Sequence, residues 1–276
     1  MKKSILILSW LVWLTYSLHS QEHATVLEDS LFSANLNSHM KFLAILPPLY
    51  NENSEEHTVL YLLHGYGGGH TDWVSRTGLV RYAGSYQFII ITPDGRNSWY
   101  SNAPNIKNAN FESYVVDDLI PYVDRKYRTL STRHGRAIAG NSMGGYGAVK
   151  LAVKHPTKFF YAASVSGGLA VPWDSRKGYE YLSPALDMAF GEQESEHWTR
   201  NSIFSLIDSV SNTNLPYMYL SIGKDDGLRR FIESARTLSE KLRGKGALYE
   251  YHELPGAHNW MFWDKEIATL LAKLSK

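Results

Sequence analysis

The sequence predicts an α/β protein built on a doubly wound, mostly parallel sheet. Short apolar segments suited to buried strands alternate with longer segments of helical period along most of the 276 residues. This alternation is typical of βαβ units, in which each helix returns the chain to the next parallel strand. A chain of this length can bury one large core, and no internal repeat or low-complexity linker divides it. We therefore expect residues 21–276 to form one domain.

The predicted elements follow one another in a regular order. A β-rich segment at 24–46 ends at two prolines, and six further strands are expected at 58–63, 87–92, 136–141, 160–166, 216–222 and 248–254. Helices are expected at 111–126, directly after residue 142, and at 228–243. Apolar side chains recur at helical spacing in the last of these, which predicts a face packed on the core.

A glycine-rich turn joins the strand at 136–141 to the helix that follows it. The turn reads Gly140-Asn141-Ser142-Met143-Gly144 and matches the pattern G-x-S-x-G. Between a strand and a helix, this pattern is typical of a nucleophile elbow, a strained turn that exposes the serine Oγ. The alternative is a tight turn without chemistry. The flanking elements favour Ser142 as a nucleophile.

A serine nucleophile needs a base to accept its proton and an acid to orient that base. In folds with a nucleophile elbow, the acid and the histidine follow the serine along the chain, in that order. Asp225 and Asp226 lie in the turn after the strand at 216–222, and we favour Asp226. Beyond them, His258 follows the last strand on a loop, whereas His252 lies within that strand and is expected to be a surface or packing residue. The predicted base is His258.

Acyl transfer also needs hydrogen-bond donors for the developing oxyanion. One donor is expected to be the backbone N–H of Met143, the residue after the nucleophile. The strand at 58–63 runs into His64-Gly65-Tyr66-Gly67-Gly68, the H-G-x-G-G type of oxyanion loop. The N–H of Tyr66 is therefore the second predicted donor. The loop lacks the Lys-Ser/Thr of a phosphate-binding Walker A motif.

Together these segments resemble the esterase D-like α/β-hydrolases. That family includes tributyrin-type esterases, S-formylglutathione hydrolases, feruloyl and acetylxylan esterases, and mycolyltransferases. The resemblance also involves the segments 93–95, 98–100, 117–123, 223–226 and 256–260. It implies the α/β-hydrolase fold, no cofactor, and a triad of Ser142, Asp226 and His258. The family's acid aligns with the second carboxylate of the turn, which strengthens Asp226 over Asp225.

Aromatic residues near the predicted strand ends are candidates for substrate contacts. Trp99 and Tyr100, on the loop after the 87–92 strand, are the preferred pair, with Trp173, Trp198, Trp260 and Trp263 as further possibilities. Each aromatic taken singly is more often a packing residue. Residues 168–214 are rich in Trp, Tyr and charge, with weak helical periods at 185–190 and 196–208. We expect this segment to be a small cap insertion over the active site.

The first 20 residues have the pattern of a secretory signal peptide. Two lysines precede a short apolar segment, and the small residue Ser20 ends the pattern just before Gln21, although Leu18 is large for a cleavage site. The apolar segment is short for a membrane helix, which needs about 20 residues. Removal of residues 1–20 leaves 26 basic and 27 acidic residues, so the formal net charge of the mature chain is −1. This near-neutral balance disfavours nucleic-acid partners and stable membrane association. We expect a secreted or periplasmic protein.

These observations favour a secreted serine esterase that acts on a small-molecule ester or an acylated polysaccharide. Acetyl or feruloyl esters of plant polysaccharide are the preferred substrates. A general short-chain carboxylesterase and an acyltransferase of the mycolyltransferase type remain alternatives. A catalytically inactive hydrolase fold that serves as a binding module is the alternative from another class.

Overall fold

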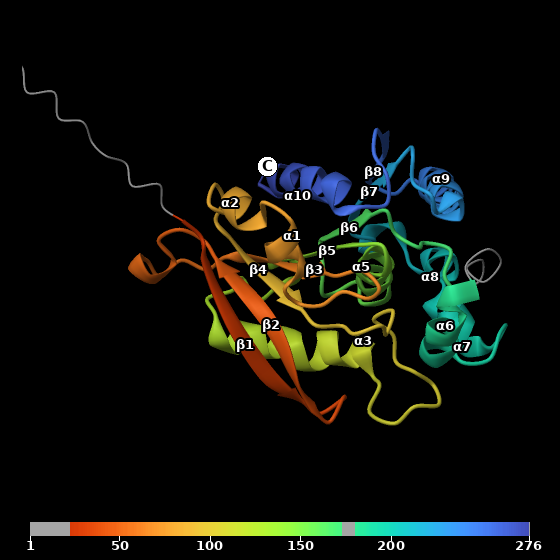
Figure 1. Cartoon of the computed structure of the whole chain (residues 1–276), viewed down its shortest axis with the longest axis horizontal. Coiled ribbons are helices and arrows are strands. Elements are labelled where there is room, and N and C mark those ends of the chain that lie inside the picture. Colours follow the sequence, from red (N-terminus) through yellow and green to blue (C-terminus); the bar gives the residue numbers. More distant parts are fainter. Residues whose placement is uncertain (1–22, 173–179, 276) are drawn as a thin grey trace, which may run out of the picture.

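The centre of the protein is one eight-stranded sheet with the order β1-β2-β4-β3-β5-β6-β7-β8 (Figure 1). The computed structural model describes residues 23–172 and 180–275, so the predicted signal peptide at 1–20 lies outside the described residues. The strands are β1 (Thr25–Ser33), β2 (Ser38–Leu46), β3 (Thr58–Leu63), β4 (Phe88–Pro93), β5 (Arg136–Asn141), β6 (Tyr161–Val165), β7 (Tyr217–Gly223) and β8 (Tyr249–Leu254).

The strand directions confirm the predicted doubly wound, mostly parallel sheet. The β-rich segment at 24–46 forms the antiparallel hairpin β1–β2, and β2 pairs antiparallel with β4. Every neighbouring pair from β4 to β8 is parallel. The other predicted strands agree with the observed bounds to within one residue. Parallel strands place their carboxyl ends, and the loops that follow them, along one edge of the sheet.

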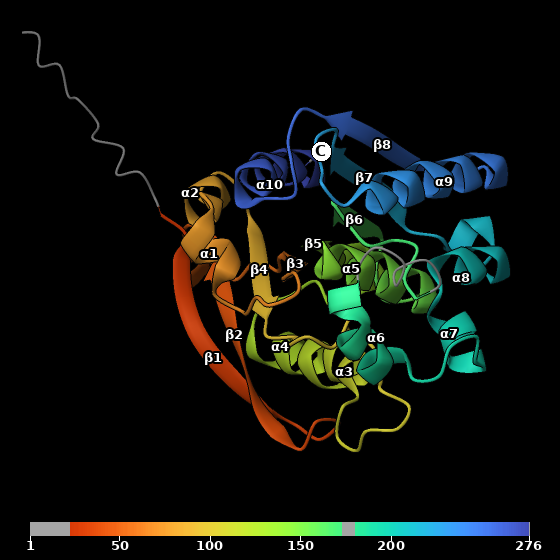
Figure 2. The same ribbon diagram turned by 45° about the vertical axis from the view of Figure 1, so that its right-hand side comes forward.

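Helices cover both faces of the sheet (Figure 2). On one face, α1, α2 and α10 pack in one apolar cluster with the sheet; on the other, α4, α5, α8 and α9 pack in a second cluster. The helices are α1 (Asp72–Arg76), α2 (Leu79–Ala83), α3 (Phe111–Ser113), α4 (Ile120–Lys126), α5 (Met143–Lys154), α6 (Ser183–Phe190), α7 (Glu196–Asn201), α8 (Ile203–Ser209), α9 (Arg229–Lys245) and α10 (Trp260–Leu274).

The predicted helix at 111–126 is continuous but irregular. A π-helical segment, Tyr114–Leu119, connects α3 to α4. The predicted helix at 228–243 is α9, and its apolar stripe is buried as expected. Within residues 23–172 and 180–275, no helix combines the length and the apolar character needed to span a membrane.

Two glycines allow α5 to begin in close contact with the strands. A Cβ on Gly140 would lie 2.5 Å from the carbonyl carbon of Gly144, and a Cβ on Gly144 would lie 2.5 Å from the carbonyl oxygen of Leu63. Both separations are shorter than real Cβ contacts. The glycines of the G-x-S-x-G pattern thus bring the start of α5 against the ends of β5 and β3, and Ser142 lies between β5 and α5.

The described residues of the predicted insertion at 168–214 include three short α-helices. α6 matches the weak period at 185–190, whereas the period at 196–208 is divided into α7 and α8 by an N-cap at Ser202. Ser202 accepts a hydrogen bond from the N–H of Ser205 (3.4 Å), which ends one helix and begins the next. α8 packs against α5, so the predicted insertion is joined to the helix that follows Ser142.

Candidate active site

Ser142 has the strained backbone expected of a nucleophile elbow. Its φ of 53° and ψ of −116° lie in a region that non-glycine residues rarely adopt. Its N–H donates to the carbonyl of Val165 (2.9 Å) at the end of β6. The residue precedes the first turn of α5, where unpaired N–H groups give a partial positive charge. This conformation directs Oγ away from the sheet and toward the loops.

A chain of two hydrogen bonds joins the three residues of the predicted triad. The distance from His258 Nε2 to Ser142 Oγ is 3.0 Å, and that from His258 Nδ1 to Asp226 Oδ2 is 2.8 Å. The Asp226 side chain is fully buried, and its Oδ1 accepts from the N–H of Leu228 (2.9 Å). A carboxylate only accepts hydrogen bonds, so Nδ1 carries the imidazole hydrogen and Nε2 is free to accept from Ser142.

The residues considered as alternatives lie elsewhere. Asp225 is exposed, and its backbone N–H donates to the carbonyl of Gly256 (2.9 Å). His252, within β8, bonds through Nε2 to Glu250 (2.8 Å) and lies beside the ring of Tyr219. The structure brings Ser142, Asp226 and His258 together and leaves both alternatives outside the cluster.

Aromatic rings fix the orientation of the His258 imidazole. Phe231 of α9 and Trp263 of α10 contact it edge-on, with ring centroids 5.8 and 5.1 Å away. The preceding Gly256 has a φ of +150° and would place a Cβ 2.5 Å from the ring of Phe262. A glycine is therefore required where the loop after β8 turns toward α10.

The predicted oxyanion loop lies directly against the elbow. A Cβ on Gly65 would be 3.4 Å from the Cβ of Ser142. In the described part of the chain, the N–H groups of Tyr66 and Met143 donate no hydrogen bond to the protein. The neighbouring Gly67 N–H donates to Asn97 Oδ1 (2.7 Å), which tethers the loop to the segment after β4. Two free donors thus adjoin the Ser142 side chain.

His64 fixes the base of the same loop. Its Nε2 accepts from the N–H of Gly95 (2.9 Å), and its Nδ1 therefore donates to the carbonyl of Gly65 (2.7 Å). The imidazole is 1% exposed, so water does not compete for these bonds. His64 thus connects the loops that follow β3 and β4.

Ser142 and His258 open into a cavity of about 450 Å³. Trp99, one of the two preferred aromatic candidates, lines it, as do Trp260 and Trp263. Tyr100 does not line it. Its ring is fully buried behind the site, and its hydroxyl donates to the carbonyl of His64 (3.1 Å). The sequence-based expectation of a substrate contact at Tyr100 is therefore wrong, because the turn after Trp99 directs the next side chain inward.

Of the two remaining aromatic candidates, Trp198 and Trp173, the structure describes only Trp198. Trp198 is buried in the insertion, where its indole N–H donates to the carbonyl of Gly191 (3.4 Å), and it does not line the cavity. Trp173 lies outside the described residues. Of the insertion's described residues, Leu182 alone lines the cavity.

Sequence analysis missed two charged residues in the cavity wall. Asp72 and Arg76 on α1 form an ion pair (3.5 Å), and the Arg76 guanidinium lies 5.6 Å from the ring centroid of Trp260. No motif marked them. Their i, i+4 spacing is the one available signal, and it is common on solvated helices. Phe231 belongs to the buried apolar stripe of α9, for which a core position was predicted, and it also lines the cavity.

A second cavity, of about 560 Å³, adjoins the first. Tyr66 lines both, and the second extends between the segment 96–111 and α6. Its charged lining residues are Arg96 and Lys107, and Met188 contributes an exposed apolar side chain. No three His, Cys, Asp or Glu side chains in the described ranges are grouped to hold a metal ion.

A family model described as putative esterase matches residues 33–274. The chain belongs to this esterase family. The esterase is 28% identical over 266 residues to an acetyl esterase of Caldicellulosiruptor saccharolyticus, an alignment that covers 91% of this chain and 98% of that protein.

The fold of the esterase is shared with solved serine hydrolases. FphF, a fluorophosphonate-binding serine hydrolase of Staphylococcus aureus, superposes with a TM-score of 0.81 at 23% identity, over 92% of this chain and 99% of that chain. A ferulic acid esterase superposes with a TM-score of 0.77 at 23% identity, over 91% and 97%. The α/β-hydrolase fold expected from the sequence is confirmed, and the esterase is a carboxylic-ester hydrolase.

Proposed function

We propose that this protein is an exported serine esterase in which Ser142 is the nucleophile, His258 the general base and Asp226 the orienting acid. The observation that carries the proposal is the continuous chain of hydrogen bonds from Asp226 through His258 to Ser142 Oγ, at 2.8 and 3.0 Å, in the wall of an open cavity. Buried Asp226 holds the tautomer that lets Nε2 accept the Ser142 proton.

The first half-reaction acylates the serine. As Ser142 Oγ attacks the ester carbonyl carbon, its proton moves to His258 Nε2, and the carbonyl oxygen becomes an oxyanion. The N–H groups of Met143 and Tyr66 donate to that oxygen. When the intermediate collapses, the carbon–oxygen bond to the alcohol breaks and His258 returns the proton to the leaving alcohol. Ser142 then carries the acyl group as an ester.

Water completes the cycle by the reverse route. His258 accepts a proton from water as the oxygen attacks the acyl carbon, and the same two N–H groups hold the second oxyanion. Collapse breaks the bond to Ser142 Oγ, which regains its proton from His258. The carboxylic acid is released, and no cofactor takes part in either half-reaction.

For the substrate, we propose acetyl or feruloyl esters on plant polysaccharide. A relative that aligns over nearly its full length is named an acetyl esterase, and a structure of the same fold is named a ferulic acid esterase. Aromatic walls at Trp99, Trp260 and Trp263 suit an aryl or acyl group. The second cavity, which shares Tyr66 with the first, gives room for a bulky alcohol portion.

Export rests on the N-terminal sequence. Residues 1–20 have the charged start and short apolar segment of a secretory signal peptide, so we place the mature domain at 21–276 in the periplasm or outside the cell. Mass spectrometry of the mature N-terminus from culture supernatant or periplasm tests this. An intact residue 1 in a cell-retained protein contradicts it.

Turnover of an ester panel by wild type and Ser142→Ala tests the catalytic proposal. The panel contains p-nitrophenyl acetate, butyrate and octanoate, methyl ferulate and acetylated xylan. We expect Ser142→Ala to lower kcat/KM by about 10⁴-fold or more on every active ester. Preference for xylan acetyl groups or ferulate supports the polysaccharide substrate, and activity confined to p-nitrophenyl esters indicates a general carboxylesterase. If neither protein hydrolyses any ester of the panel, a binding module or an acyltransferase remains, whereas equal hydrolysis by both proteins contradicts the proposed site at Ser142.

A further inference from the structure

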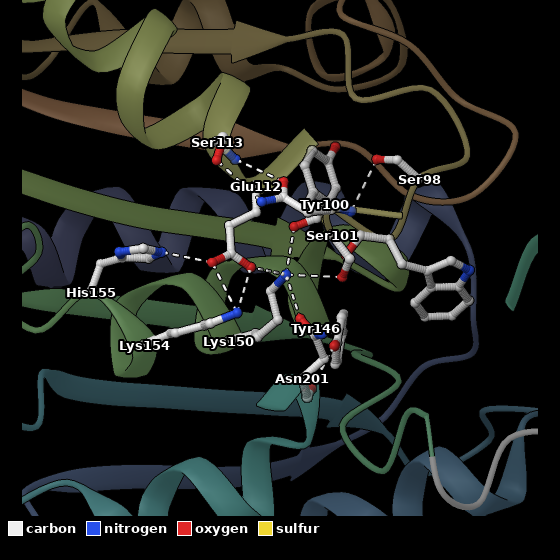
Figure 3. A network of polar contacts seen from close by, with 12 residues as sticks. Ser98, Tyr100, Ser101, Glu112, Ser113, Tyr146, Lys150, Lys154, His155 and Asn201 are labelled. Carbon is white, nitrogen blue, oxygen red and sulfur yellow. Dashed lines mark hydrogen bonds and ion pairs between the residues drawn. The ribbon is translucent and has the colours of Figure 1, made fainter. Parts of the chain in front are cut away.

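A fully buried lysine lies on the nucleophile helix, outside the proposed catalytic groups. Lys150 is on α5, eight residues after Ser142, and its side chain is 0% exposed. A buried ammonium is costly unless hydrogen bonds and an opposite charge compensate it. Figure 3 shows the ammonium at the centre of a polar network in which Glu112, Ser101 and Asn201 surround it.

The ammonium connects α5 to partners that lie 38 to 51 residues away in the sequence. It donates to the carbonyl of Tyr100 (2.6 Å) and to Ser101 Oγ (2.9 Å), both on the segment after β4. It also bonds to Glu112 Oε2 of α3 (3.0 Å) and lies 3.5 Å from Asn201 Oδ1 of α7. The two shortest of these contacts are those to the segment after β4.

That segment has a backbone that needs support. Trp99 and Tyr100 are consecutive non-glycine residues with φ values of 53° and 50°. Such conformations persist only where the surrounding structure enforces them. The indole N–H of Trp99 has no hydrogen-bond partner in the described part of the chain, so no bond of its own fixes the ring. The Lys150–Tyr100 bond holds the backbone immediately beyond Trp99, and Trp99 lines the cavity.

The same helix face also holds the base of the insertion. Tyr146, one turn before Lys150, donates through its hydroxyl to the carbonyl of Asn201 (2.6 Å), and its ring contacts Trp99 edge-on at 5.8 Å. Two side chains of α5 therefore contact both Asn201 and the segment that carries Trp99. The Ser142 helix and this part of the cavity wall form one packed unit.

Glu112 balances the charge of the network. Its carboxylate bonds to Lys150 (3.0 Å), to the half-buried Lys154 (3.0 Å) and to His155 (3.0 Å). Burial lowers the pKa of Lys150 to about 8, with the charge of Glu112 acting in the opposite direction. Lys154 contacts Glu112 from the same helix but has no bond to the Trp99 segment, which makes it a matched control.

We propose that Lys150 is a positioning residue that fixes the Trp99 wall of the active-site cavity and thereby sets which ester groups the enzyme accepts. The inference rests on the proposed active site at Ser142. Because Lys150 does not reach the cavity, it acts through the Tyr100 carbonyl and Ser101. A small acetyl group fills little of the cavity, whereas a long acyl chain reaches more of its walls. Displacement of Trp99 therefore changes selection among esters more than it changes the chemical step.

The test compares Lys150→Met with Lys154→Met. For each protein, kcat and KM are measured on p-nitrophenyl acetate, butyrate and octanoate, and folding is checked by thermal unfolding. In Lys150→Met, we expect the octanoate-to-acetate ratio of kcat/KM to change by about tenfold, mainly through KM, with acetate kcat largely retained. Lys154→Met removes a positive charge from the same cluster and is expected to keep the wild-type ratio.

A second variant keeps the proposal testable if Lys150→Met fails to fold. Ser101→Ala removes the bond that Ser101 Oγ accepts from Lys150 (2.9 Å) and the bond that it donates to the Trp99 carbonyl (3.2 Å), while it leaves every charge in place. A change of about threefold in the ratio is expected. A folded Lys150→Met or Ser101→Ala with the wild-type ratio overturns the proposal, as does an equal change in Lys154→Met. Ser142→Ala is assayed alongside, and turnover in that variant would instead overturn the proposed active site.

Discussion

Helix α5 carries two polar clusters that differ in their access to solvent. At its N-terminus, Ser142 opens into a cavity of about 450 Å³, and its backbone has a positive φ of 53°. Eight residues later, the Lys150 side chain is fully buried, and its ammonium is bonded to Tyr100, Ser101 and Glu112. In the roles that we propose, the same helix presents Ser142 to a substrate and uses Lys150 to hold the surrounding walls. Substitutions at the Ser142 site are therefore expected to lower turnover, whereas substitutions in the Lys150 network are expected to change ester selectivity or stability.

Asp226→Asn is expected to have the largest effect, and the effect falls on catalysis. Asp226 Oδ1 accepts from the N–H of Leu228, so an asparagine oxygen keeps that bond and its amide faces His258 Nδ1. The imidazole must then accept at Nδ1 and carry its hydrogen on Nε2, where it cannot take the Ser142 proton. We expect kcat to fall by about 10⁴-fold, with thermal stability close to wild type.

The adjacent aspartate gives the control for this measurement. Asp225 is exposed and has no side-chain bond to His258 in the described structure. Asp225→Asn is therefore expected to keep wild-type kcat on p-nitrophenyl acetate. Near wild-type turnover in Asp226→Asn, with a loss in Asp225→Asn, would reverse the assignment of the acid.

The cluster of Ser142, Asp226 and His258 could be predicted from sequence. The proposed chemistry requires particular residue types at particular places along the chain. The elbow needs glycines at fixed positions, and the acid and base follow at the ends of later strands. Ser142, Asp226 and His258, which the structure brings together, were predicted in this way. So were the strands β3 to β8, whose predicted bounds agree with the observed ones to within one residue. A feature can be predicted from local sequence where a single segment contains all the residues that the feature requires.

The buried cluster around Lys150 and Glu112 has no comparable sequence pattern. Within the helical sequence of α5, Lys150 is indistinguishable from a lysine on a solvated surface, because its partners lie 38 to 51 residues away. Tyr100 was misassigned for a related reason. Whether an aromatic residue faces the cavity or the core depends on the φ of 53° and 50° in that segment. Those values are set by tertiary contacts, including the bond from Lys150.

Gly65→Ala is expected to have an intermediate effect, on the oxyanion donors. A Cβ at this position would lie 3.0 Å from Asn141 Nδ2 and 3.4 Å from Ser142 Cβ, so the loop must shift by a few tenths of an ångström. The adjacent Tyr66 N–H shifts with it. We expect kcat to fall by about 10²-fold with little change in KM, because the donor acts on the oxyanion formed during reaction.

Gly69→Ala is the matched control in the same loop. A Cβ at Gly69 meets no atom within 4 Å, and the residue's φ is not in the left-handed region. Wild-type kinetics are expected. A loss in Gly69→Ala as large as that in Gly65→Ala would show that the loop is sensitive to any added side chain, and would remove the support for a donor at Tyr66.

Glu112→Gln is expected to have the smallest effect on turnover and a clear effect on stability, the reverse of Asp226→Asn. Burial alone would raise the pKa of Glu112, but the charge of Lys150, the hydrogen bond from His155 and the charge of Lys154 hold it well below its ordinary value of 4.5. Removing the carboxylate leaves the buried Lys150 without its counter-charge. We expect the free energy of unfolding at pH 7 to fall by about 3 kcal/mol. Acetate turnover should stay within the wild-type order of magnitude, because Tyr100 and Ser101 still accept from Lys150.

The lowered pKa of Glu112 determines how the stability difference between wild type and Glu112→Gln changes with pH. A carboxylate whose pKa is lower in the folded state contributes stability that is fully present above its unfolded pKa and is lost as the pH falls. The stability difference between wild type and Glu112→Gln should therefore be largest at neutral pH and shrink below about pH 4.5. Urea unfolding between pH 3 and pH 7 measures it, with the exposed Glu55→Gln as the surface control. If Glu112→Gln instead lost turnover as severely as Asp226→Asn while remaining fully stable, the two clusters of α5 would share one function, and the division between them would be wrong.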